Sequence, residues 1–193
     1  MPELLVLGGD RAGDYHARRL RRAGAGEVRL VTSDWAAVLR RWLASASPDD
    51  QVVPGPLMPH LLWEWLAGEL GAVPSPAPRG WDLPYEREGS SGELYLSVAA
   101  WVCPATCVEP ATCPAILAPR AWDLADLIEA RARAEGLQPA VFRCLQYAGG
   151  VGTISAGALQ AAAQEGLGSA GTLVATSSYC HAAVGCLAAP DGP

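Results

Sequence analysis

Runs of hydrophobic residues alternate with amphipathic stretches along most of the chain. The apolar runs 4–7, 27–32, 51–53, 93–102, 139–146 and 171–179 have the length of β-strands. Between them, the segments 12–23, 35–43, 59–70, 122–135 and 155–165 fit helices. Strands that alternate with helices are typical of a parallel sheet, because each parallel crossover needs a helix. The pattern therefore predicts an α/β fold with a mostly parallel sheet of about six strands, covered by helices on both faces.

We expect this fold to be a Rossmann-like three-layer sandwich that forms one domain over residues 1–193. Within it, a proline-containing stretch at 71–80 separates an N-terminal half, 1–70, from a half that carries a cysteine loop, 93–189. Ligands of such sheets gather beyond the carboxyl ends of the strands. This rule places four segments at one rim of the sheet: 8–10, 103–113, 149–152 and 179–181.

The first glycine loop, VLGGDRAG, follows the first expected strand and precedes a helix and a second strand, VRLVTSD. Residues 3–35 resemble the first βαβ unit of NAD(P)-binding Rossmann proteins, which include domains of potassium-uptake regulators. The resemblance implies a dinucleotide-binding turn at Gly8, Gly9 and Gly13, with Asp34 bonding a ribose hydroxyl. Asp10 stands where the family pattern has its second glycine. The alternatives are a simple tight turn for the glycines and a helix N-cap for Asp34.

A second glycine loop, YAGGVGTIS at 147–155, also follows an expected strand and opens an expected helix. Gly150, Gly152 and Ser155 are spaced so that backbone N–H groups and the helix N-terminus could hold an anion. The middle position of this loop is glycine, as the close approach of a phosphate requires. The alternative is an ordinary turn in which Ser155 caps the helix.

The most informative segment is the loop WVCPATCVEPATCP at 101–114. Its three thiols, Cys103, Cys107 and Cys113, are close in sequence, and its prolines stiffen the backbone around them. Soft thiolates select zinc or iron–sulfur clusters, and four ligands are usual. Zinc ribbons use paired C-x2-C knuckles, which this loop lacks, so we predict an iron–sulfur cluster, with zinc as the alternative. Buried thiols and a redox disulfide are the remaining interpretations.

The fourth ligand must come from another part of the chain. Cys180 is favoured, because it follows the last expected strand and so lies at the same rim as the loop. His181 and Cys144 are the alternatives, although Cys144 is expected inside a strand. Cys186 lies in an apolar run and is expected to be a core thiol. Glu109 is expected either to accept a hydrogen bond beside the metal or to be a solvated charge.

Composition narrows the function classes. The net charge of −6 argues against nucleic acid as a partner. All 14 basic residues are arginine, which excludes Schiff-base and P-loop lysine chemistry. The sequence lacks a basic leader and a run of 18 apolar residues, so we expect a cytoplasmic protein with no membrane span.

Two hypotheses follow for the function. The first is a redox or electron-transfer protein with an iron–sulfur cluster, whose partner is a small anionic ligand or a redox protein. The alternative is a zinc-stabilised regulatory module that senses a nucleotide such as NAD(P), or binds a partner, without catalysis. An oxidoreductase activity and a homodimer both stay open at this point.

Overall fold

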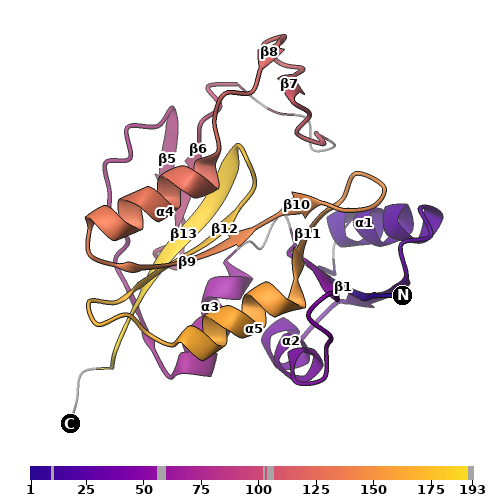
Figure 1. The fold of residues 1–193 in the computed structure, drawn as a ribbon, viewed down its shortest axis with the longest axis horizontal. Coiled ribbons are helices and arrows are strands. Elements are labelled where there is room, and N and C mark those ends of the chain that lie inside the picture. Colours follow the sequence, from indigo (N-terminus) through magenta and orange to yellow (C-terminus); the bar gives the residue numbers. More distant parts are fainter. Residues whose placement is uncertain (10, 56–59, 102, 104–106, 191–193) are drawn as a thin grey trace.

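The structure of the protein is a computed structural model, which describes residues 1–9, 11–55, 60–101, 103 and 107–190 (Figure 1). The helices in these ranges are α1 (Arg11–Arg22), α2 (Trp35–Leu43), α3 (Leu61–Leu70), α4 (Leu124–Ala134) and α5 (Ala156–Glu165). Each coincides to within about two residues with a helix that the hydrophobic pattern predicts, so the expected helices are confirmed. No helix in the described ranges combines the length and the apolar character needed to cross a bilayer.

One sheet, here called the N-terminal sheet, has the strand order β10–β11–β3–β1–β2. Its strands are β1 (Glu3–Leu7), β2 (Glu27–Val31), β3 (Gln51–Val53), β10 (Leu145–Gln146) and β11 (Gly152–Ser155). β1 pairs in parallel with β2 on one side and with β3 on the other. β11 is antiparallel to both β3 and β10. The parallel part of this sheet therefore matches the strand–helix–strand unit expected at the N-terminus.

The other sheet, here called the C-terminal sheet, has the order β5–β6–β13–β12–β9, and β4 also pairs with β13. Its strands are β4 (Val73–Ser75), β5 (Tyr85–Glu88), β6 (Leu94–Ser97), β9 (Gln138–Arg143), β12 (Thr172–Ser177) and β13 (His181–Ala188). Among the described strands of this sheet, only β9 and β12 pair in parallel. Two short strands, β7 (Thr112–Cys113) and β8 (Ala118–Pro119), form a separate hairpin beyond one end of this sheet (Figure 1).

The prediction of one Rossmann-like three-layer sandwich with a mostly parallel sheet is wrong, because the chain forms two larger sheets and most of their pairings are antiparallel. The main reason is β13, which the sequence pattern did not reveal as a strand. β13 pairs antiparallel with β12, in a register that places Ala182 opposite Ser177. The residues Ala182–Leu187 are all buried, so the alternation of polar and apolar residues that marks a half-exposed strand is absent.

The second misplaced element is β11. The sequence predicts that the glycine turn leads directly into a helix, but Gly152–Ser155 forms a strand before α5 begins. This strand pairs with β3, so a segment from the C-terminal half extends the N-terminal sheet. The two halves of the chain are thereby joined through backbone hydrogen bonds.

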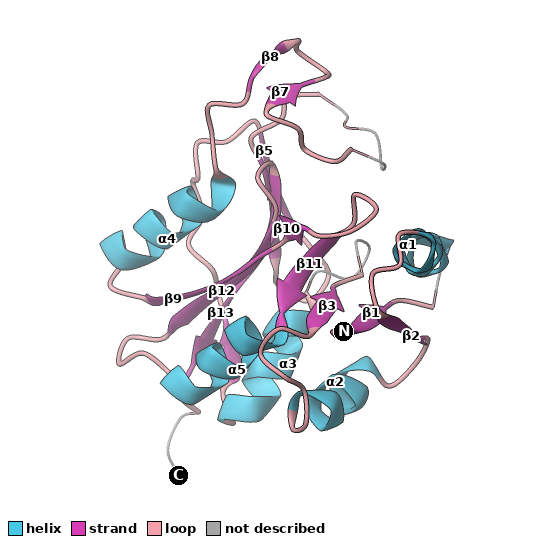
Figure 2. Cartoon of the chain, turned by 45° about the vertical axis from the view of Figure 1, so that its right-hand side comes forward, coloured by secondary structure: helices cyan, strands magenta, loops and turns pink. Residues whose placement is uncertain are grey.

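Helices fill the space between the sheets and cover their outer faces (Figure 2). α2, α3 and α5 share one hydrophobic cluster with side chains of both sheets, including Leu5 and Val174. α1 packs on the other face of the N-terminal sheet, and α4 packs on the other face of the C-terminal sheet. The hydrophobic core is therefore divided over three clusters, and the β7–β8 hairpin lies at the opposite end of the C-terminal sheet from α3 and α5 (Figure 1).

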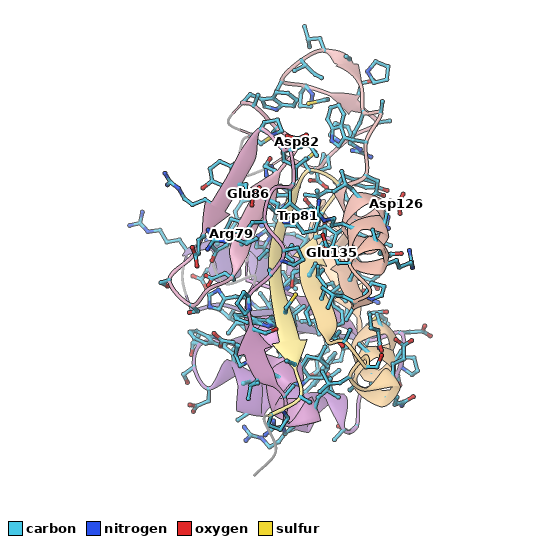
Figure 3. All side chains as sticks on the ribbon, turned by 90° about the vertical axis from the view of Figure 1, so that its left-hand side faces the viewer. Arg79, Trp81, Asp82, Glu86, Asp126 and Glu135 are labelled. Carbon is cyan, nitrogen blue, oxygen red and sulfur yellow. The ribbon has the colours of Figure 1, made fainter. Side chains whose placement is uncertain are left out.

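The segment between β4 and β5 is attached to α4 around Trp81, which is buried and bonded to Glu86; both are labelled in Figure 3. The Arg131 guanidinium lies 5.6 Å from the centre of the Trp81 ring. The Glu86 carboxylate accepts hydrogen bonds from the N–H groups of Gly80 and Trp81, at 3.0 and 2.9 Å. These contacts fix the start of β5, where Tyr85 lies.

The contact between α3 and β13 gives a test of the packing. Gly185 lies on β13 under the Trp63 indole, and a Cβ atom there would be 2.5 Å from Trp63 Cε2. Trp63 cannot easily move, because it is buried and its Nε1–H donates to the Cys186 carbonyl at 3.1 Å. Gly185→Ala is therefore expected to lower the free energy of unfolding by about 1–3 kcal/mol, as measured by urea denaturation. A double-mutant cycle supplies the control, since the cost of Gly185→Ala should fall in the Trp63→Phe background; equal costs would contradict the contact.

Candidate functional site: a pocket lined by cysteines

A cavity of about 710 Å³ lies between the cysteine loop, the turn that joins β12 to β13, and the carboxyl end of β3. Five of the six cysteines line it: Cys103, Cys107, Cys113, Cys144 and Cys180. The sixth, Cys186, is buried in the core of the C-terminal sheet, as the sequence predicts. The structure thus brings the three loop cysteines, Cys180 and both alternative fourth ligands, Cys144 and His181, to one cavity.

The cysteine lobe, here defined as residues 107–122, is attached to the β12–β13 turn through Glu109. The Glu109 carboxylate accepts hydrogen bonds from the Ser178 hydroxyl at 2.7 Å and from the Tyr179 backbone N–H at 3.1 Å. Glu109 is therefore a hydrogen-bonded carboxylate and not the solvated loop charge that is one of its expected roles. Its partners lie about 70 residues further along the chain, which is why the sequence alone does not identify them.

Arg120 makes the second attachment. Its guanidinium donates hydrogen bonds to the carbonyl oxygens of Glu109 and Pro110, the latter at 2.9 Å. The same group lies 3.7 Å from the centre of the Tyr179 ring, a cation–π contact. Arg120 therefore closes the lobe on itself and holds it on the turn. Sequence reasoning missed this residue, because an isolated arginine after a loop carries no distinguishing signal.

Two tryptophans flank the thiols. The Trp122 indole Nε1–H donates to Cys180 Sγ at 3.2 Å, and the rings of Trp101 and Trp122 lie 6.1 Å apart. Trp101 lies two residues before Cys103 and also lines the pocket. An N–H group directed at sulfur favours the thiolate form, while the aromatic rings keep water away from it. The sequence offered no signal that Trp122 would reach Cys180.

Burial raises the pKa of three thiols in the pocket, because a thiolate is poorly solvated there. It raises the pKa of Cys180 to about 11, against the opposing effect of the Trp122 hydrogen bond. It raises the pKa of Cys144 to about 12, and it also raises the pKa of Cys103. Desolvation lowers the pKa of His181, so its imidazole is neutral at pH 7. These thiols therefore carry protons at neutral pH, and a metal that binds them must displace those protons.

The second glycine loop lines the pocket with only two of its three predicted anion-binding residues. Gly149 and Gly150 form the turn between β10 and β11, and Gly150 and Gly152 line the cavity. Ser155 lies at the other end of β11, about 10 Å from Gly152 at the usual rise of a strand. There its hydroxyl accepts a hydrogen bond from the Ala158 N–H as the N-cap of α5. The three residues therefore do not form one loop around an anion.

The first glycine loop has a packing role in the structure. A Cβ atom at Gly13 would lie 2.2 Å from the Gly8 carbonyl oxygen, so the close approach of α1 to the turn requires glycine. A Cβ atom at Gly9 would meet the Thr32 carbonyl oxygen at 2.8 Å. Asp34 occupies the N-cap position of α2, but its side chain makes no capping hydrogen bond. Asp10 lies outside the described residues, and the described lining of the pocket does not include these glycines or Asp34.

The thiols line the cavity without touching a common point. Within the ranges that the structure describes, no three His, Cys, Asp or Glu side chains are grouped closely enough to hold a metal ion as they stand. The pocket is thus a space with cysteines in its lining.

Comparison with known proteins gives a family match. A family described as "Uncharacterized protein, C-terminal domain" matches residues 58–189. No curated protein and no solved structure matches the chain. The matched region contains all six cysteines, whereas β1, α1, β2, α2 and β3 precede it.

The attachment of the cysteine lobe can be tested at the Tyr179 amide. Glu109→Ala removes the acceptor of this N–H group, and a hydrogen bond to a charged acceptor contributes about 1.5 kcal/mol, or roughly tenfold in protection. We expect hydrogen exchange at Tyr179 to accelerate by about that factor, as measured by NMR. Glu27→Ala, which removes an exposed carboxylate on β2, is the control and should leave Tyr179 unchanged. Unchanged protection in the Glu109 variant would show that the carboxylate does not hold the turn.

Proposed function

The chain belongs to the uncharacterized C-terminal domain family that matches residues 58–189, and we propose that it holds an iron–sulfur cluster and has a redox or electron-transfer role. The proposed ligands are Cys103, Cys107, Cys113 and Cys180. One observation carries the proposal: thiols far apart in the sequence line a single cavity.

The spacing of the loop cysteines favours a cluster over a single zinc ion, because the loop lacks the paired C-x2-C knuckles of zinc ribbons. Four sulfurs bound to one zinc ion lie about 4 Å from one another, because each Zn–S bond is about 2.3 Å. The sulfurs that ligate a cluster bind different iron atoms and lie farther apart. Zinc remains the alternative that metal analysis must distinguish.

The surroundings of the thiols also support a redox role. Hydrogen bonds to sulfur and exclusion of water set the potential of an iron–sulfur cluster. Trp122 supplies such a hydrogen bond to Cys180, and Trp101 adds an apolar wall. A cluster held here would exchange electrons with a redox partner protein or with a small molecule in the same cavity.

The proposal is tested by anaerobic preparation of the protein, followed by iron and sulfide analysis and a visible absorption spectrum. We expect bound iron with matching sulfide in the natural chain and loss of nearly all of it in Cys107→Ser. Cys186→Ser is the matched control, because Cys186 is buried in the core away from the pocket and its loss should leave the iron content unchanged. Iron-free protein would refute the cluster, and stoichiometric zinc in a colourless protein would support the alternative instead.

A second test addresses the hydrogen bond to Cys180. Trp122→Phe keeps an aromatic ring but removes the N–H group that donates to the sulfur. Because such a hydrogen bond stabilises the more negative, reduced cluster, its loss is expected to lower the midpoint potential by an amount on the order of tens of millivolts. The measurement is an anaerobic redox titration with optical or EPR detection. Trp42→Phe, which alters a core indole in α2, is the control and should not move the potential.

A further inference from the structure

Part of the pocket lining contains no thiol, and the residues named next are here called the thiol-free wall. Three separate parts of the fold contribute to it: His16 on α1, Val53–Gly55 at the end of β3, and Tyr85 and Tyr95 on the β5–β6 hairpin. The first two parts come from the N-terminal segment that precedes the family match, and the third comes from the matched region. A 710 Å³ cavity falls within the range of small-molecule sites, so an organic molecule can lie against this wall beside the cysteines.

The topology supports a ligand at this position. β2 and β3 lie on opposite sides of β1, so the chain changes its direction of winding between β1 and β3. In α/β sheets, ligands bind beyond the carboxyl ends of the strands at such a switch point. Val53, Pro54 and Gly55 lie at the carboxyl end of β3 and line the cavity. The residues Val53–Gly55 of the thiol-free wall therefore lie at the switch point of the N-terminal sheet.

The charges of the pocket indicate what kind of molecule fits. In the described lining, Glu109 is the carboxylate and Arg120 the guanidinium, and both already bond to other parts of the protein. A ligand with a full charge would lose its hydration here without meeting an unengaged carboxylate or guanidinium in the described lining, which is costly. A neutral ligand avoids that cost.

Tyr85 indicates the shape of the ligand. Its side chain lines the cavity, yet the residue is 43 % exposed. Within the described part of the chain, its ring makes no aromatic or cation–π contact. An exposed tyrosine ring beside an apolar cavity is suited to stack on a flat ligand.

We propose that the thiol-free wall binds a neutral organic molecule with an aromatic ring, in contact with Tyr85. The presence of this molecule next to a redox centre rests on the proposed function, but its binding to the wall does not. The ligand would thus be the substrate of the cysteine-bound centre, held at the switch point of the N-terminal sheet.

The test uses three probes that share one ring and differ in charge: benzyl alcohol, benzoate and benzylammonium. Their dissociation constants are measured by NMR titration of the anaerobically prepared chain and, in parallel, of Cys107→Ser. We expect benzyl alcohol to bind at least tenfold more tightly than either ion in both proteins, with shifts at the amides of Val53 and Gly55. Equal or tighter binding of an ion, or of NADH in competition with benzyl alcohol, would overturn the proposal.

A pair of tyrosine variants locates the site. Tyr85→Ala is expected to weaken benzyl alcohol binding at least fivefold. Tyr147→Ala is the matched control, because Tyr147 is 42 % exposed but does not line the cavity, and it should have no effect. If both variants bind as the natural chain does, the ligand does not contact this wall.

The outcomes separate the two proposals. A protein that holds no iron but still binds benzyl alcohol through Tyr85 would refute the cluster and leave the binding wall standing. A protein that holds a cluster but binds none of the probes would refute only the wall.

Discussion

The attachment of the cysteine lobe to the β12–β13 turn is the interaction on which the pocket depends. None of the three hydrophobic clusters in the described part of the chain includes a residue between 103 and 121, so burial does little to hold the lobe. Leu117 at its tip is 84 % exposed. The Glu109 carboxylate and the Arg120 guanidinium instead supply polar contacts to Ser178 and Tyr179. A segment held by a few polar contacts unfolds locally more readily than a core strand. A metal centre that bridged the lobe to Cys180 would stabilise the attached arrangement.

The hydrophobic core and the candidate site lie in different parts of the molecule. The two sheets and the helices packed between and around them form the hydrophobic core. The pocket is lined mainly by loops and by the ends of strands. β11 comes from the C-terminal half and pairs with β3 of the N-terminal half. This pairing fixes the pocket residues of the two halves relative to each other. The cavity therefore combines thiols from the C-terminal half with His16 and Val53–Gly55 from the N-terminal half.

Local patterns in the sequence were sufficient for the helices, for the β1–α1–β2 unit and for the grouping of the loop cysteines with Cys180. They were insufficient for the sheets, because hydrophobic runs do not distinguish a parallel crossover from an antiparallel hairpin when both faces are buried, as in β13. The glycine motif at Gly8 and Gly13 looked like a nucleotide turn, yet the same residues allow α1 to pack closely on β1. The contacts of Glu109 and Trp122 span many residues, and no local pattern records them.

The charge balance of the pocket links the proposed centre to its ligand. Buried thiols are neutral until metal displaces their protons, so loading makes the cavity more negative than the metal-free state. Arg120 is not available to pair with an added negative charge, because its guanidinium already bonds the Glu109 and Pro110 carbonyls and lies on the Tyr179 ring. A small anion of the kind that the second glycine loop led us to expect would then meet repulsion as well as desolvation. A neutral ligand beside Tyr85 avoids both costs.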